Sequence, residues 1–172
     1  HLVDEAVHMM GTSAIVGSSI SVAVGSAWAS KLSGASYRTV VFFGDSGPET
    51  GQFYEALNFS ALHSLPILFV CENNRYATQT PLSARQPDRD MGLVALHMGL
   101  RSAAKTVDDV EQVYDSAMTL LAKLPAYMEI ATYRYREHVG PNYDYDLGYR
   151  TKAEVDAVMA SDPVKRLAKQ IS

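Results

Sequence analysis

Cysteine is nearly absent from this sequence, with Cys71 the single one among 172 residues. A disulfide framework and a multi-cysteine zinc site are therefore both excluded. Positive charge is not in excess either, because 15 Lys and Arg residues stand against 19 Asp and Glu residues and the net charge is −4. A protein that holds nucleic acid through phosphate contacts needs the opposite balance, so we expect no nucleic-acid partner.

Long hydrophobic runs are also missing. The best candidate for a membrane span, residues 14–32, has four serines in its middle part and is closed by Lys31. A spanning helix needs about 20 predominantly apolar residues, so we expect no membrane role and predict instead a helix that packs closely on all sides within a protein. The first ten residues do not resemble a signal peptide, and together with the single cysteine this favours a reducing cytoplasm.

Three short apolar runs predict buried strands, namely residues 39–43 (TVVFF), 67–71 (ILFVC) and 127–133 (YMEIATY). The first two lack a polar alternate face, which is typical of a parallel sheet covered on both sides. Helical patterns occupy residues 52–65 and 107–123. Strands that alternate with helices indicate βαβ units. The predicted fold class is therefore α/β with three layers, a mostly parallel sheet with helices on both faces.

Two polar segments, residues 75–90 and 136–150, interrupt this alternation and are expected to be functional or mobile loops. Residues 151–172 predict a C-terminal helical tail of two short helices, which separate at Asp162-Pro163. The length suits one domain over residues 1–172. Because the chain starts with His1 rather than Met, we expect it to be a fragment of a longer subunit.

The sharpest motif is the Gly-Asp-Ser-Gly segment at residues 44–47, directly after the first predicted strand. A glycine-rich turn from a strand into a helix presents backbone N–H groups to an anion such as phosphate. A carboxylate in that turn would repel phosphate unless it held a divalent cation that bridges the two, and Mg²⁺ prefers such oxygen ligands. Asp45 is therefore a candidate metal ligand, and a helix cap is an equally good explanation of it.

Polar residues also follow the other two predicted strands. The second strand ends in residues 73–76 (NNRY), and the third is followed by Arg134, Arg136 and His138. Because the carboxyl ends of adjacent parallel strands meet at one edge of the sheet, we expect the turn to face Asp45 and to add neutral oxygen ligands for Mg²⁺. Arginine can clamp a phosphate and histidine can move protons, although an ordinary turn and a solvated loop also explain these residues.

The same glycine-rich loop is similar to the nucleophile segment of trypsin-like serine proteases, GDSGGP, with one glycine missing. Ser46 would then be the nucleophile of a hydrolase. That family is all-β and has its catalytic histidine upstream, whereas Ser46 lies between a predicted strand and a predicted helix and has only His1 and His8 upstream. Pro48 also occupies the last glycine position of the G-x-S-x-G elbow. A serine hydrolase is therefore the minor alternative.

Taken together, these segments resemble a known family. The pair Gly44-Asp45, followed further along by Asn73-Asn74, is similar to the thiamine diphosphate motif that begins GDG and ends NN. The wider runs AIVG, GDSGPETGQFYEALNFSAL, LPILFVCENNRYATQT and TYRYREH resemble the α subunit of thiamine-diphosphate-dependent 2-oxo acid dehydrogenases. That group includes the pyruvate, branched-chain 2-oxo acid and acetoin dehydrogenases.

The resemblance implies a role for each matching position. Magnesium would be held by Asp45, Asn74 and the main-chain carbonyl of Tyr76. The cofactor diphosphate would lie against the backbone of Ser46 and Gly47. Arg134 corresponds to the arginine that binds the diphosphate, and His138 to the active-site histidine of the flexible loop. The main chain that contacts the aminopyrimidine ring corresponds to Ile15, Val16 and Gly17.

The implied activity is oxidative decarboxylation of a 2-oxo acid, or cleavage of acetoin, with acyl transfer to a lipoyl-bearing acyltransferase. A β subunit would complete the site, and self-association is expected. The sequence departs from the family pattern at Ser46, where the second glycine of GDG stands, and at Glu49, where asparagine is common. These departures motivate a different class of function, a non-catalytic assembly domain with the same fold. Val139 replaces a serine that is phosphorylated in some mitochondrial members, so that switch is expected to be absent.

Overall fold

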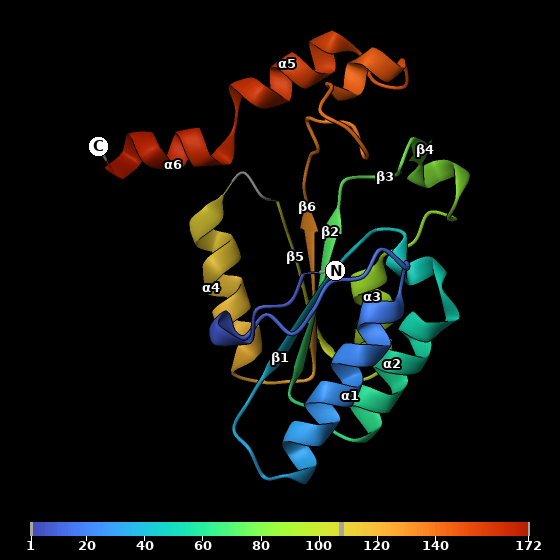
Figure 1. Cartoon of the computed structure of the whole chain (residues 1–172), viewed down its shortest axis with the longest axis vertical. Coiled ribbons are helices and arrows are strands. Elements are labelled where there is room, and N and C mark those ends of the chain that lie inside the picture. Colours follow the sequence, from blue (N-terminus) through green and yellow to red (C-terminus); the bar gives the residue numbers. More distant parts are fainter. Residues whose placement is uncertain (1, 107–108, 172) are drawn as a thin grey trace.

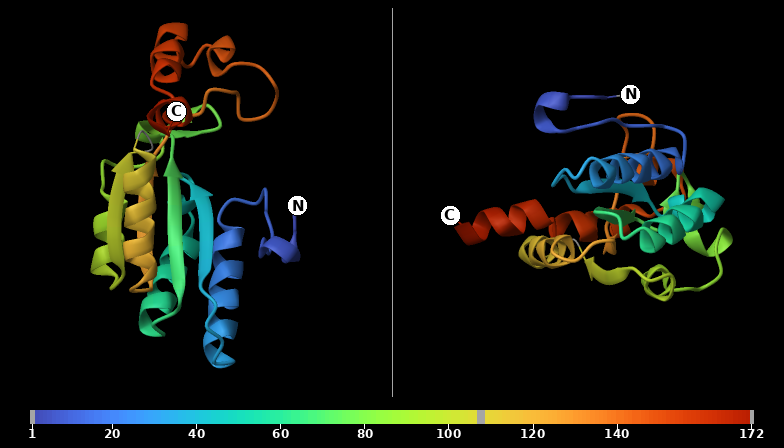
Figure 2. Two further views of the ribbon diagram at one scale, coloured as in Figure 1. Left: turned by 90° about the vertical axis from the view of Figure 1, so that its left-hand side faces the viewer. Right: turned by 90° about the horizontal axis from the view of Figure 1, so that it is seen from below.

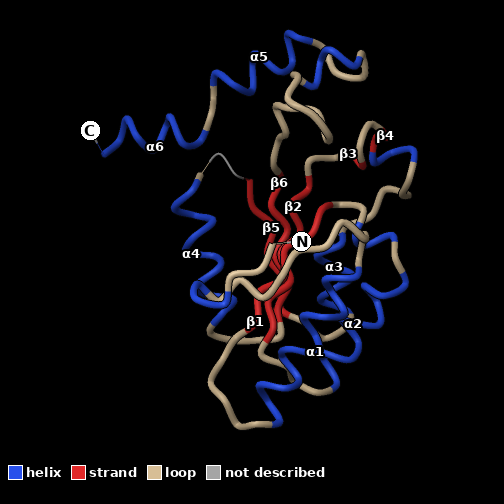
Figure 3. The backbone as a smooth tube through the Cα atoms, in the orientation of Figure 1, coloured by secondary structure: helices blue, strands red, loops and turns tan. Residues whose placement is uncertain are grey.

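The computed structural model describes residues 2–106 and 109–171. Its main sheet has the strand order β1-β2-β6-β5, and all three neighbouring pairs are parallel. The strands are β1 (Thr39–Gly44), β2 (Ile67–Asn73), β5 (Arg101–Thr106) and β6 (Ala126–Ala131). Gly44 pairs with Glu72 and Asn73 pairs with Ala131, so the carboxyl ends of β1, β2 and β6 meet at one edge of the sheet (Figure 3).

Helices lie on both faces of this sheet, and the three-layer α/β prediction is confirmed, although β1 is covered on one face only, with Val40 39% and Phe42 60% exposed on the other. On one face lie α1 (Ser18–Leu32), α2 (Gly51–Leu62) and α3 (Met91–His97), and on the other lies α4 (Val110–Leu121) (Figures 1 and 2). Successive residues of β2 enter opposite cores, with Phe69 packed under α2 and Val70 under α4. This two-sided burial explains why the strand reads as a continuous apolar run.

The structure corrects two sequence expectations and bears out a third over the described residues. A fourth strand, β5, was not predicted, because its RSAAKT sequence is short and polar and it forms a sheet edge. The helix over 14–32 is not packed on all sides, since only one side of α1 meets β1 and α2, and Val22 and Leu32 are 71% and 68% exposed. The predicted helix 107–123 is found as α4, although residues 107–108 lie outside the described part of the chain.

The two long loops contain short elements of their own. Residues 75–90 include an antiparallel pair, β3 (Tyr76–Ala77) and β4 (Thr80–Pro81), and residues 136–150 include the 3₁₀ helix η4 (Asp144–Leu147). At the place of the predicted helical tail lie α5 (Lys152–Ala160) and α6 (Pro163–Ile171), beyond the carboxyl edge of the sheet (Figure 1). Among the described residues, no helix combines the length and apolarity of a membrane span.

Candidate cofactor site at the carboxyl edge of the sheet

The loop after β1 passes directly into the 3₁₀ helix η2 (Gly47–Glu49) and then into α2. Ser46 has a φ of −83°, an ordinary conformation for an L residue, so serine in place of glycine brings no backbone strain here. Gly47 is required by close packing, because a Cβ atom there would lie 2.8 Å from the Phe43 ring. The flanking parallel strand and helix show that the trypsin-like, all-β interpretation of this motif is wrong.

Asp45 is buried, with 4% of its surface exposed, and its side chain is paired with a cation. The guanidinium of Arg85 donates from Nη2 to Asp45 Oδ2 and from Nη1 to Glu49 Oε1. Gln86 Nε2 also donates to the main-chain oxygen of Asp45 and to Glu49 Oε1, each at 2.8 Å. Neither η2 nor α2 has a side-chain cap, so the helix-cap explanation of Asp45 is not supported.

The turn after β2 is held by side-chain to backbone hydrogen bonds. Asn74 Oδ1 accepts from the Tyr76 N–H at 3.0 Å, and Asn73 Oδ1 accepts from the Arg75 N–H at 2.9 Å. Asn73 Nδ2 in turn donates to Glu129 Oε1 on the neighbouring strand β6 at 2.8 Å. This is the turn geometry expected of an Asn-Asn pair, and it fixes the orientation of both amides.

A small cavity opens between the first two loops. Asp45, Asn73, Glu129 and Cys71 contribute to its lining, and Gln86 and Leu82 close it from the long loop. Of the two asparagines, Asn73 therefore faces the cavity together with Asp45, whereas the Asn74 amide oxygen is turned to Tyr76. Burial, together with the Glu129 carboxylate, raises the pKa of the Cys71 thiol to about 12, so the thiol stays neutral at physiological pH.

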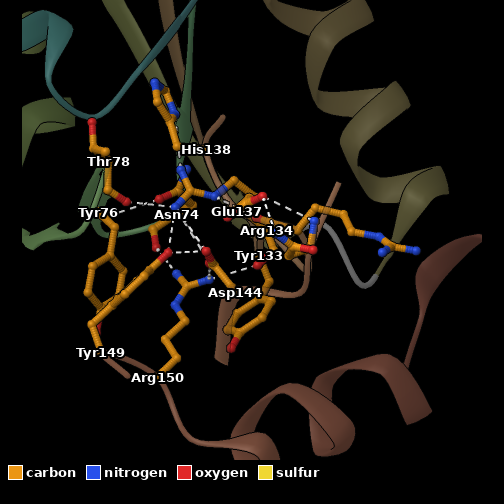
Figure 4. Close-up of polar contacts among 12 residues, drawn as sticks. Asn74, Tyr76, Thr78, Tyr133, Arg134, Glu137, His138, Asp144, Tyr149 and Arg150 are labelled. Carbon is orange, nitrogen blue, oxygen red and sulfur yellow. Dashed lines mark hydrogen bonds and ion pairs between the residues drawn. The ribbon is translucent and has the colours of Figure 1, made fainter. Parts of the chain in front are cut away.

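The loop after β6 is organised around one fully buried carboxylate, Asp144 (Figure 4). It accepts from Arg150 Nη1 at 2.8 Å, from the Tyr149 hydroxyl, and from Arg134 Nη2 at 3.4 and 3.5 Å. Arg134 Nη2 also donates to the main-chain oxygen of Thr78 at 2.7 Å. The third loop is thereby joined to the turn after β2.

Arg150 links these groups to the asparagine turn. Its guanidinium lies over the rings of Tyr76 and Tyr133, at 4.3 and 4.2 Å from their centroids, and Nη2 donates to the main-chain oxygen of Asn74 at 3.1 Å. His138 lies on the exposed side of the same group, with Nδ1 at 3.2 Å from Arg134 Nη1 (Figure 4). The structure therefore brings Arg134, His138 and the Asn74–Tyr76 turn together.

The segment at residues 15–17 adjoins the first loop. Gly17 has a φ of +83°, and a Cβ atom on it would lie 2.7 Å from Thr50 Oγ1, so this position needs glycine on both counts. Ser21 Oγ further donates to Gln52 Oε1 at 3.1 Å, which joins the start of α1 to the start of α2. Ile15 and Val16 are exposed beside this junction.

Comparison with known proteins identifies the family. The whole chain, residues 1–172, matches the family model described as "Dehydrogenase E1 component". The chain belongs to this family. It is 31% identical over 176 residues to the pyruvate dehydrogenase E1 component subunit alpha of Rickettsia bellii (strain RML369-C). The matched region covers 99% of this chain and 53% of the relative. It is 30% identical over 147 residues to the 2-oxoisovalerate dehydrogenase subunit alpha of Bacillus subtilis (strain 168), over 83% and 44% of the two chains.

The E1 chain spans about half the length of the curated relatives it matches. A solved structure from Mycobacterium smegmatis, of an enzyme described as thiamin diphosphate-dependent, is similar with a TM-score of 0.55 and 25% identity. The similarity covers 67% of this chain and 22% of that chain. The parallel sheet with helices on both faces is thus the fold of this group of enzymes.

The residues at the carboxyl edge of this E1 chain fit magnesium diphosphate in their chemistry. Among the described residues, no group of three His, Cys, Asp or Glu side chains gathers as a metal site. A metal here would use one carboxylate with amide and carbonyl oxygens and would complete its shell with ligand oxygens, which is the binding mode that Mg²⁺ prefers. The buried Asp45 carboxylate is paired with the Arg85 guanidinium, as a buried charge requires.

Several residues of the site were missed by sequence reasoning. Arg85 and Gln86 lie in a segment that was expected only to be a functional or mobile loop, and nothing local to them indicates a partner some 40 positions away. Asp144 and Arg150 lie in the second such loop, where the concentration of tyrosines was the only available signal. An ion pair across 40 positions, such as that of Arg85 with Asp45, leaves no periodic pattern in a sequence.

Proposed function

We propose that this chain binds the diphosphate and the magnesium ion of thiamine diphosphate as part of a 2-oxo acid dehydrogenase. The observation that carries the proposal is the meeting, at one sheet edge, of a buried and cation-paired Asp45, the asparagine turn and the Arg134–His138 group. Membership of the E1 family and the printed names of the relatives support the same reaction class.

In this proposal, the residues predicted from the sequence take the following roles. Asp45, Asn74 and the Tyr76 carbonyl hold Mg²⁺, and the backbone of Ser46 and Gly47 holds the diphosphate. Arg134 binds the diphosphate, the main chain of Ile15, Val16 and Gly17 contacts the aminopyrimidine ring, and His138 serves as the catalytic histidine. Bound thiamine diphosphate supplies an electron sink for decarboxylation of a 2-oxo acid.

The full reaction requires partners. We propose a β subunit that completes the site, a lipoyl-bearing acyltransferase that receives the acyl group, and self-association of the α chain, all in the cytoplasm. The exposed Val22 and Leu32 on the outer side of α1 are compatible with burial in such an assembly. The choice between pyruvate, a branched-chain 2-oxo acid and acetoin depends on the parts that complete the site.

The test is calorimetric titration of the α chain, with its β subunit, by thiamine diphosphate in the presence and absence of Mg²⁺. We expect Mg²⁺-dependent binding that Asp45→Asn weakens by more than about 100-fold, the upper range for changes to groups that only support a metal ligand. Asp115→Asn on α4 removes the same charge from an exposed position and serves as the matched control. If the wild-type complex does not bind, the chain is a non-catalytic assembly domain.

The serine hydrolase alternative has its own experiment. Ser46 accepts the Glu49 N–H through its main-chain oxygen at 3.1 Å and is only the residue that precedes η2 in the structure. We expect an active-site fluorophosphonate probe to leave Ser46 unlabelled. Labelling that disappears in Ser46→Ala would establish the hydrolase instead.

A further inference from the structure

Arg85 occupies an unusual position, because its guanidinium joins two carboxylates beside the proposed diphosphate site. One is Asp45, the proposed magnesium ligand, and the other is Glu49, which stands where asparagine is common in the family. Arg85 is 10% exposed, and both of its terminal nitrogens are committed to these acids. Gln86 reinforces the arrangement by donating to Glu49 Oε1 and to the Asp45 main-chain oxygen.

Electrostatics give this arrangement a consequence for anion binding. A diphosphate next to η2 would meet the negative charge of Glu49, and Mg²⁺ on Asp45 neutralises only part of the total. In a partly buried site such repulsion is poorly screened by solvent. The guanidinium supplies one positive charge to Glu49 and at the same time binds Oδ2 of Asp45, which fixes the direction of that carboxylate. Metal-binding carboxylates are commonly oriented by a hydrogen bond of this kind.

We propose that Arg85 is a positioning residue that neutralises Glu49 and orients Asp45, so that a chain with glutamate at position 49 can accept magnesium diphosphate. The inference rests on the proposed cofactor function. It predicts a specific coupling: Arg85 is needed because Glu49 is present. An arginine that merely competed with the metal for Asp45, or that bound the diphosphate directly, would show no such dependence.

The experiment is a double-mutant cycle in the α chain with its β subunit. The variants are Arg85→Gln, Glu49→Gln and the combination, with Arg85→Lys as the charge-conserving variant. Binding of thiamine diphosphate with Mg²⁺ is measured by calorimetry at low and high salt, and thermal unfolding is recorded for every variant. Arg38→Gln, an exposed arginine at the opposite end of β1, is the matched control for the lost charge.

We expect Arg85→Gln to weaken binding at least about tenfold, as truncating one partner of a partly buried ion pair does. Adding Glu49→Gln should restore affinity to within about threefold of wild type, and high salt should reduce the loss only slightly, because a partly buried charge pair is poorly screened. Arg85→Lys keeps the charge but not the two-nitrogen fork that joins Asp45 and Glu49, so it should lose less affinity than Arg85→Gln without matching wild type. If Arg85→Gln destabilises the fold, the cofactor affinities of Arg85→Lys and of Glu49→Gln, each compared with that of wild type, still test the proposal.

Three results would overturn the inference while leaving the cofactor proposal intact. Tighter binding by Arg85→Gln would mean that the arginine competes with Mg²⁺. Unchanged binding would mean that the contact is structural only. Weaker binding that Glu49→Gln does not rescue would mean that Arg85 acts on the diphosphate itself. Failure of the wild-type complex to bind overturns the proposed function, and the inference with it.

Discussion

Asp144 holds the loop after β6 together, and the effect of removing its charge can be predicted quantitatively. The carboxylate is fully buried and accepts from two arginines and one tyrosine hydroxyl. Asp144→Asn keeps the size of the side chain but removes its charge. Arg150, whose side chain is 1% exposed, then has no buried counter-ion, while the more exposed Arg134 can turn to water.

The magnitude follows from the burial of Arg150. Removing one partner of a buried ion pair costs about 3–5 kcal/mol, because the remaining charge is left uncompensated. Residues 134–150 lie outside the sheet, so the loss falls mainly on the free energy that holds this loop against the turn after β2 rather than on global unfolding. At about 1.4 kcal/mol per factor of ten, the open population of the loop rises by roughly two to four orders of magnitude.

Limited trypsin digestion measures this opening. Arg136 is exposed at the start of the loop, and its cleavage rate follows the open population when closing is faster than cutting. We expect Asp144→Asn to be cut roughly 100-fold or more faster than wild type, and Asp146→Asn, an exposed acid in the same 3₁₀ helix, to be cut at the wild-type rate. A rate for Asp144→Asn within a few-fold of wild type would show that the Arg150 charge is satisfied in another way.

Three further predictions concern stability. Burial raises the pKa of Cys71 from 9.0 to about 12, so the contribution of the neutral thiol to the free energy of unfolding is fully present below about pH 9 and is lost as the pH rises toward 12. Cys71→Ala should therefore flatten this part of a plot of urea midpoint against pH. Gly17→Ala should lower the melting temperature through its positive φ and its contact with Thr50, whereas Gly25→Ala, inside α1 with open space around it, should raise the free energy of unfolding by up to about 1 kcal/mol. Phe53→Ala should cost about 3–5 kcal/mol in chemical denaturation, because its ring is fully buried under the sheet.

The sequence was most informative where burial imposes a local pattern. The three predicted strands are β1, β2 and β6; β2 and β6 bury consecutive residues, whereas β1 buries only Val41 and Phe43 and leaves Phe42 60% exposed. β5 escaped prediction because an edge strand needs no apolar run, and α3 escaped it because its seven residues follow a long polar segment. The partial exposure of α1 could not be read from composition, since a helix rich in small residues looks the same whether its outer side meets solvent or another subunit.

The site was predicted from the order of the strands rather than from burial. The parallel strand order was enough to bring the Asp45 loop, the asparagine turn and the Arg134–His138 loop to one edge, because adjacent parallel strands end side by side. What topology cannot give is the identity of the partner that each side chain takes. Asp45 pairs with Arg85, which lies in the loop of residues 75–90, outside every predicted helix and strand. The pairing depends on how this loop folds as a whole. Glu49 was seen in the sequence as a departure that adds negative charge to the site, and the structure adds that its charge is met by an arginine from that loop. A departure at one position is therefore best judged together with the contacts of the new side chain, since the charge that a substitution adds can be balanced far away in the sequence.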